Sequence, residues 1–272
     1  MLKVKKPIKI DAEEVYKACI EGRFNPKIKN AYVECWPEVQ QEYDLYQKNA
    51  VNNLLHLTQR KVFADLTSDN LINLYKNRLV KVLELRRYYD FILASADKCP
   101  FCGIALNPKT LDHYLHKNEF PQFAVFPFNL IPCCDTCNRI KGTSIPSKRG
   151  DYYINPYYDT EIYDERWLYA RIATHSPIGV KFYVQESVKL SEMQNRKIRF
   201  HFQQLELSKS YSIKAAEMIS NLNWELKDNR DIKGALAKKI NPRQPVNYWH
   251  NVLIECLLND QWYCRHGYRQ TD

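Results

Sequence analysis

The spacing of apolar and polar residues predicts a chain whose first part is helical. Residues 11–22 place acidic side chains in a first turn and a glycine at the end, a pattern typical of a short helix. A longer helical pattern covers residues 38–63. Thr67 and the polar residues after it offer N-cap groups for a third helix that reaches about Ala96, with apolar residues at a 3.6-residue period.

The pattern changes in the last third of the chain. Short apolar alternations over residues 161–185 are typical of strands. Helical periodicity returns over residues 189–238, with a break near residues 207–210. A last helix is expected over residues 246–262.

These elements divide the chain into three predicted parts. A helical N-terminal arm spans residues 1–96, a Cys-rich core spans residues 97–150, and a mainly helical region, which packs on the core or on a partner, spans residues 151–272. No internal repeat or low-complexity linker separates them, so the core is expected as an insert between helical segments. The predicted fold class is α+β and mainly helical.

Composition favours a folded chain and is compatible with a nucleic-acid partner. A chain of 272 residues with 45% hydrophobic residues can bury a substantial core. The net charge of +9 suits phosphate neutralisation, although many soluble proteins carry such an excess without binding nucleic acid. Neither a signal peptide nor a membrane-spanning apolar segment is evident, so we expect a cytoplasmic protein that does not bind membranes.

Cysteines are concentrated in the predicted core, which holds five of the nine. Cys99 and Cys102 form one Cys-x-x-Cys pair, and Cys134 and Cys137 form a second. Two such pairs supply four thiolates for one tetrahedral zinc ion. Cys133 could replace Cys134, but the symmetrical spacing favours Cys134. In a reducing compartment, clustered pairs of this kind indicate a metal site and not disulfides.

Polar residues between and just after the cysteine pairs form a second candidate site. Asp112 offers a hard oxygen ligand of the kind that Mg²⁺ or Mn²⁺ prefers. A neutral His113 is suited to take a proton from water at cellular pH. The amide of Asn129 is expected to tie one loop to the backbone of another. Asn138 is expected near a helix start, where its carbonyl oxygen would complete the metal site.

Three further residues have weaker signals. Arg139 and Lys141 add positive charge suited to a substrate phosphate. His116 follows the Asp-His pair and is expected to be a surface or loop residue, with an accessory phosphate contact as the alternative.

Asp112, His113, Asn129 and Asn138, framed by the two cysteine pairs, resemble the HNH endonuclease motif in its zinc-knuckle form, with Asn in place of the last His. The resemblance implies a ββα-metal fold in which a hairpin carries Asp112 and His113, a loop carries Asn129 and a helix carries Asn138. It also implies that His113 is the general base, that Asp112 and Asn138 hold one Mg²⁺ or Mn²⁺ ion, and that Asn129 orients His113. This sequence departs from the motif at His116, a position where similar sequences often have Pro.

The wider layout of helical arm, zinc-knuckle core and helical C-terminal region resembles the HNH subunits of anti-phage systems of the Septu type, including those associated with retrons. This resemblance implies an ATPase partner and a role in defence. We therefore predict a metal-dependent endonuclease that acts on nucleic acid, with DNA favoured. Two alternatives stay open: an HNH-fold RNase that cleaves, for example, tRNA, and a non-catalytic zinc-ribbon module that binds nucleic acid or a protein.

Overall fold

The fold is described from a computed structural model, in which the described residues are 2–50, 54, 57, 59, 62, 63, 65–143 and 151–270. The chain divides into two compact units. The unit that we call the N-terminal unit comprises residues 3–149 and 155–159, and the C-terminal unit comprises residues 150–154 and 160–272 with the first two residues of the chain. The helices that precede the Cys-rich segment and the segment itself therefore belong to the same unit. The predicted three-part division stays a prediction.

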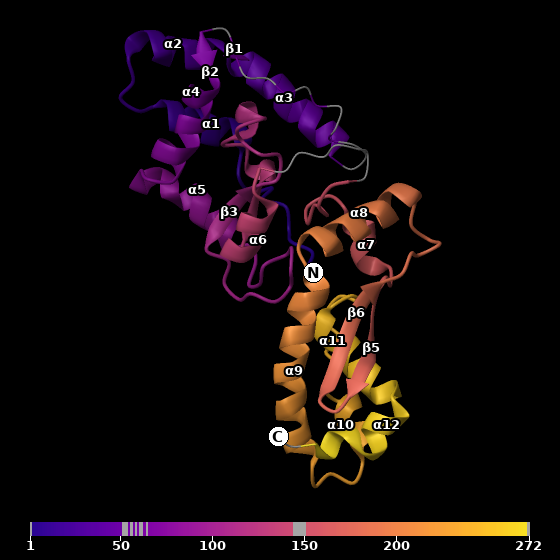
Figure 1. The fold of residues 1–272 in the computed structure, drawn as a ribbon. Coiled ribbons are helices and arrows are strands. Elements are labelled where there is room, and N and C mark those ends of the chain that lie inside the picture. Colours follow the sequence, from indigo (N-terminus) through magenta and orange to yellow (C-terminus); the bar gives the residue numbers. More distant parts are fainter. Residues whose placement is uncertain are drawn as a thin grey trace. The chain divides into compact units, whose positions relative to one another are not determined.

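The N-terminal unit begins with helices (Figure 1). Its first elements are α1 (Ala12–Ile20), α2 (Pro26–Glu34), α3 (Trp36–Asn49), β1 (Val62–Phe63), β2 (Leu66–Thr67), α4 (Ser68–Asn73), the π-helical turn η2 (Leu74–Leu79) and α5 (Leu83–Leu93). The predicted helix over residues 11–22 is confirmed by α1. Its N-cap is Asp11, whose carboxylate accepts a hydrogen bond of 2.9 Å from the backbone N–H of Glu13.

Two predicted helices of this region are wrong in extent. The helix predicted over residues 38–63 ends at Asn49, and Val62 already belongs to β1; most residues between them lie outside the described part. The third predicted helix does start at Thr67, which forms a capping box with Asn70. However, the α-helix ends at Asn73 and continues as the π-helical turn η2. The chain then leaves helical structure before α5 begins at Leu83. Val80 and Val82 in this interruption are β-branched, which lowers helix propensity.

The Cys-rich segment folds as a β-hairpin followed by a helix. β3 (Thr110–His113) pairs in antiparallel fashion with β4 (Leu130–Cys133), in a register that places His113 opposite Leu130. The connection contains two short 3₁₀ turns, and α6 (Asp135–Lys141) begins almost directly after β4. This ββα arrangement and the helices around it confirm the predicted α+β class, mainly helical.

Aromatic packing joins the helical region to the connection between β3 and β4. Tyr43 of α3 stacks on Phe126 with ring centroids 4.1 Å apart, and Tyr46 meets Phe123 edge-on at 5.1 Å. All four rings are buried. Because these contacts link α3 to the loop that follows His113, the helices support the loop from outside the hairpin.

The C-terminal unit is built on a second hairpin. Its elements are α7 (Thr160–Asp164), β5 (Leu168–His175), β6 (Ile178–Val184), α8 (Glu192–Gln204), α9 (Leu207–Leu226), α10 (Ile232–Ala237), α11 (Trp249–Asn259), α12 (Gln261–Arg265) and the 3₁₀ turn η5 (Gly267–Arg269). The predicted strands and helices of this region are confirmed in kind, except that α7 occupies the start of the predicted strand segment. The predicted helix break lies at Leu205 and Glu206, where Glu206 has a φ of +48°.

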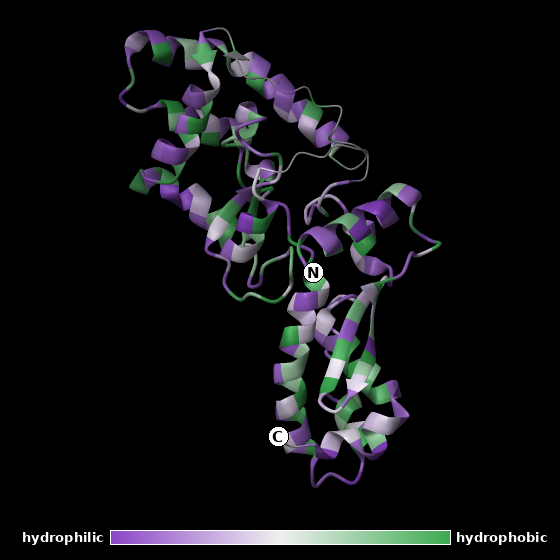
Figure 2. Cartoon of the chain, viewed as in Figure 1, coloured by the Kyte–Doolittle hydropathy of each residue, from purple (hydrophilic) through white to green (hydrophobic). Residues whose placement is uncertain are grey.

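One face of the second hairpin forms part of the core of its unit. Hydrophobic and hydrophilic residues alternate along β6 (Figure 2). Val180 and Phe182 are buried, and the Phe182 ring meets that of Tyr211 on α9 edge-on at 5.4 Å. α11 packs along β5. No described helix of either unit has the length and apolar character needed to cross a membrane.

Candidate functional site

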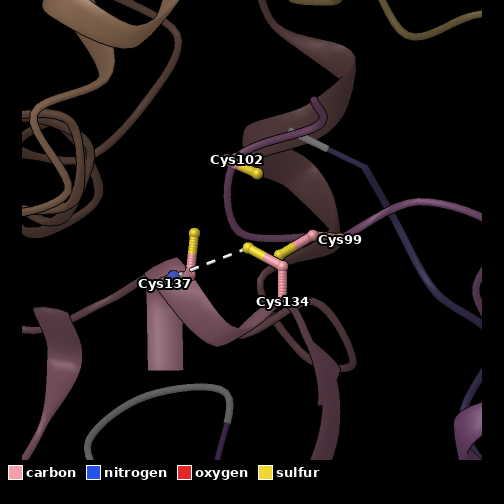
Figure 3. A group of neighbouring side chains, drawn as sticks. All are labelled: Cys99, Cys102, Cys134 and Cys137. Carbon is pink, nitrogen blue, oxygen red and sulfur yellow. Dashed lines mark hydrogen bonds between the residues drawn. The ribbon is translucent and has the colours of Figure 1, made fainter. Parts of the chain in front are cut away.

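Four cysteine side chains converge where the Cys-rich segment begins and where α6 begins. The sulfur atoms of Cys99, Cys102, Cys134 and Cys137 lie within 4.8 Å of one another and surround a common space (Figure 3). Four thiolates are a ligand set that zinc accepts in tetrahedral geometry, so the group could hold a structural metal such as zinc. Cys133 is buried next to this group, and its thiol donates to the carbonyl oxygen of Cys134 at 3.3 Å. The group of four contains Cys134 and not Cys133, as the spacing predicts.

A tight turn positions the first cysteine pair, and the start of α6 positions the second. After Cys102 the chain turns through Gly103, whose φ of +68° is a conformation that glycine adopts at little cost. The turn is closed by hydrogen bonds from Gly103 N–H to the Cys99 carbonyl at 2.7 Å and from Cys99 N–H to the Ala105 carbonyl at 2.8 Å. In the second pair, Cys134 is the N-cap of α6, and its sulfur accepts from the Cys137 N–H at 3.5 Å.

The four thiols affect one another's ionisation. Hydrogen bonds from Cys134 and Cys137 lower the pKa of Cys102. Hydrogen bonding to Cys102 raises the pKa of Cys137 and that of Cys134. Four negative sulfurs at this separation repel one another strongly, and a divalent cation removes that cost.

Asp112, His113 and Asn138 line one cavity of about 380 Å³ in the N-terminal unit. The first two lie at the end of β3, and Asn138 lies on α6. The sequence predicted these three residues as a site from separate segments, and the ββα arrangement brings them to the same cavity. Their catalytic roles stay predictions.

His113 is held by a backbone acceptor. Its Nε2 lies 2.9 Å from the carbonyl oxygen of Ala124, and this pairing assigns the proton to Nε2 and leaves Nδ1 as the basic atom. The ring is buried. Burial is the largest effect that lowers its pKa well below the ordinary value, with the positive charge of Lys117 next. The neutral ring, which can accept a proton, is therefore favoured.

Asn129 ties two stretches of the connection together. Its Oδ1 accepts from the Leu115 N–H at 2.7 Å, and its Nδ2 donates to the carbonyl oxygens of Leu115 at 3.0 Å and Phe123 at 3.2 Å. Phe123 directly precedes Ala124, the residue that binds His113. The fully buried amide of Asn129 thus connects the chain after His113 with the acceptor of the His113 ring.

Lys141 lies in a different environment from the exposed one expected of a phosphate-binding residue. Its side chain is 1% exposed, and its Nζ lies 2.9 Å from Oδ2 of Asp112 and donates to the carbonyl oxygen of His113 at 2.7 Å. Burial raises the pKa of Asp112, and the Lys141 ammonium opposes that effect. Arg139, two residues earlier on α6, is exposed. Arg139 does not line the cavity, and Lys141 is paired with Asp112.

Three residues of the cavity were missed or undervalued by the sequence interpretation. Tyr75 of η2 places its ring edge-on to His113, with centroids 4.3 Å apart. Lys117 and His116 line the same cavity, and burial lowers the pKa of His116 to about 4. Proximity in sequence to His113 could have drawn attention to Lys117, but no local signal connects Tyr75 with this site.

Asp112 and Asn138 offer the oxygen donors that a hard divalent cation accepts. Asp112 offers a carboxylate and Asn138 an amide oxygen, because the Asn138 Nδ2 donates to Thr110 Oγ1 at 3.2 Å. Mg²⁺ commonly takes one or two carboxylates and completes its shell with water and phosphate. The Lys141 ammonium already contacts the Asp112 carboxylate, so a divalent ion would share this carboxylate with Lys141 or displace it.

Comparison with known proteins gives two informative similarities. The chain is 28% identical to protein Ea31 of Escherichia phage lambda over 93% of this chain and 95% of that protein. It is 36% identical to the Septu protein PtuB of Bacillus thuringiensis over 70 residues, about a quarter of each chain. No protein-family model matches the chain, and no solved structure matches it. The similarity to the phage protein thus extends along nearly the whole chain, and that to the Septu protein is partial.

Removing one thiol tests the four-cysteine group. We expect Cys102→Ala, purified as the full chain, to lose stoichiometric zinc and to unfold at a lower temperature, because metal binding contributes directly to folding free energy. Zinc content by atomic spectroscopy and thermal unfolding by circular dichroism measure the two effects. Cys133→Ala is the matched control, since it removes a buried thiol outside the group of four and should keep the zinc. Full zinc and an unchanged melting temperature in Cys102→Ala would contradict the assignment.

Lys141 and Arg139 allow a second test within one helix. Lys141→Ala leaves the buried Asp112 carboxylate without its cation, which costs about 3–5 kcal/mol of unfolding free energy. Arg139→Ala removes an exposed charge and should change stability by less than about 0.5 kcal/mol. Urea unfolding of both variants measures the difference, and equal stabilities would show that the Lys141–Asp112 pair is not a structural contact.

Proposed function

We propose that this protein is a metal-dependent nuclease of the HNH type, which hydrolyses phosphodiester bonds of nucleic acid, with DNA favoured. The observation that carries the proposal is the convergence of Asp112, His113 and Asn138 on one cavity from a hairpin and a helix, next to a four-cysteine group. A zinc-ribbon module that only binds a partner has no need of a buried histidine with one anchored nitrogen.

In this proposal His113 is the general base. Its Nε2–H donates to the Ala124 carbonyl, so Nδ1 takes the proton from a water molecule that attacks the phosphorus. Asn129 is a positioning residue, because it fixes the backbone on both sides of this contact. Arg139 offers a charge for a neighbouring phosphate.

Asp112 and Asn138 would hold the catalytic divalent ion, Mg²⁺ or Mn²⁺, which when bound supplies charge stabilisation for the phosphate and the leaving 3′-oxygen. The four cysteines would hold zinc as a structural ion that does not contact substrate. The two groups would take different metals, because the cysteines offer soft sulfur donors and Asp112 with Asn138 offers hard oxygen donors.

We further propose that the nuclease acts in anti-phage defence together with an ATPase partner. The partial similarity to a Septu protein supports this assignment. A nuclease with an assembled site must be restrained in the cell, and a partner protein is a suitable means of restraint.

The proposal is tested by incubating the purified, zinc-loaded chain with Mg²⁺ or Mn²⁺ and, separately, supercoiled DNA, linear DNA, single-stranded DNA and tRNA. We expect cleavage that requires the added ion and is lost, by at least about a hundredfold, in His113→Ala, since general-base catalysis contributes about 10²–10⁴-fold. Gel electrophoresis of the products also separates DNA from RNA as the substrate.

His266→Ala is the matched control, because this histidine is exposed, belongs to the C-terminal unit and does not line the cavity. Both variants should fold and keep stoichiometric zinc, and His266→Ala should keep the wild-type melting temperature. His113→Ala should melt at a lower temperature, because it removes a buried ring that contacts Tyr75 and the Ala124 carbonyl. Cleavage by His113→Ala at the wild-type rate would exclude His113 as the base. Absence of cleavage of every substrate by the zinc-loaded wild-type chain, with and without a co-purified ATPase, would contradict the nuclease proposal.

A further inference from the structure

The outer face of the β5–β6 hairpin carries two aromatic and two basic side chains. Tyr169 lies opposite Tyr183 in the strand register, and Arg171 lies opposite Lys181. Residues two apart on a strand share a face, so these four side chains form one surface, which we call the Tyr–Arg surface. The opposite face, with Phe182, packs on α9.

The two tyrosine rings are arranged as a stacking platform. Their centroids are 6.0 Å apart with an angle of 25° between the planes, and both rings are partly exposed. The guanidinium of Arg166 lies over the Tyr169 ring, 5.2 Å from its centroid. Exposed, nearly parallel aromatic rings on a sheet are suited to stack on unpaired nucleic-acid bases.

Arg171 and Lys181 lie opposite each other, and their like charges repel. Like charges directly opposite in an antiparallel pair destabilise the sheet, and both side chains are exposed. Within the described residues, neither Arg171 nor Lys181 forms an ion pair. An anion that binds between them would relieve this repulsion. One face thus combines aromatic rings with cations, and it fits a ligand that has both flat bases and phosphates.

A cavity of about 540 Å³ adjoins the surface between β5 and α11. Its lining includes Tyr169, Arg171 and Asn259, which gives room for a base or sugar beside the rings. The two acidic residues of the lining both have partners, and one of these partners, Arg166, lines the same cavity. Glu255 pairs with Arg166 at 2.6 Å, and Asp260 accepts from the Tyr263 N–H at 2.7 Å as the N-cap of α12.

We propose that the Tyr–Arg surface binds single-stranded nucleic acid, with bases stacked on Tyr169 and Tyr183 and phosphates held by Arg171 and Lys181. This binding site is separate from the residues of the proposed nuclease site and does not require cleavage. Duplexes fit the surface poorly, because their bases are already stacked on one another.

The test measures binding by fluorescence anisotropy, with the zinc-loaded full chain carrying His113→Ala and no added divalent ion. The probes are labelled oligothymidylate, oligouridylate and a DNA duplex, each about 20 nucleotides long, which exceeds the footprint of a single stacking surface. We expect Tyr169→Ala/Tyr183→Ala to weaken single-strand binding by at least about tenfold and duplex binding by less than about twofold. Tyr169→Phe/Tyr183→Phe keeps the rings and should stay within about threefold of the parent.

The charges are tested separately by Arg171→Gln/Lys181→Gln. If each side chain holds one phosphate, the slope of log affinity against log salt should fall in magnitude by about 1.4 for a single strand. Lys209→Gln/Lys238→Gln removes the same charge from exposed positions elsewhere in the unit and should leave the affinity within about twofold. Unchanged single-strand affinity in the folded Tyr→Ala double variant, or an equal loss in the lysine control, overturns the proposal. Cleavage activity enters neither outcome, so failure of the nuclease proposal remains distinguishable.

Discussion

The convergence of four sulfur atoms is the constraint on which the rest of the Cys-rich segment depends. It ties the turn at Cys99–Cys102 to the first turn of α6, although 31 residues (103–133) separate the two pairs in sequence. Since α6 begins almost directly after β4, fixing the start of the helix also fixes its direction relative to the hairpin. A small ββα arrangement buries too little apolar surface to do this alone, and metal binding is the usual remedy at this size.

The two ends of α6 perform different tasks. Its N-cap and its first turn each contribute one thiol, whereas its last residue, Lys141, contacts the buried carboxylate of Asp112 and the carbonyl of His113. The structural group and the candidate active site are thus joined by one helix of seven residues. A change in the group of four cysteines would displace Asn138 and Lys141 together, so it should also affect the candidate active site.

Residues that belong to a motif or a ligand spacing could be predicted from sequence, and contacts made by residues outside the motif could not. Cysteine spacing identified the group of four because ligand geometry imposes the spacing. Tyr75 was not identified, because it reaches His113 only through a π-helical turn in a segment whose period predicts an unbroken helix. Lys141 was taken as a phosphate ligand because sequence gives its charge and not its burial. In the C-terminal unit, alternation predicted strands, but only the register shows that Arg171 and Lys181 face each other.

Net charge alone does not decide whether this chain binds nucleic acid. The contacts of individual cations show which of them already have an acidic partner. Arg166 is paired with Glu255, Arg196 makes two hydrogen bonds to Asp151, and Lys141 is buried against Asp112. These cations stabilise the fold, and their charge is largely neutralised by a neighbour. Arg171 and Lys181 instead repel each other across a hairpin beside two exposed rings. A basic excess favours nucleic-acid binding where cations lie together without an acidic partner. Among the described residues, Arg171 and Lys181 of the Tyr–Arg surface meet this condition.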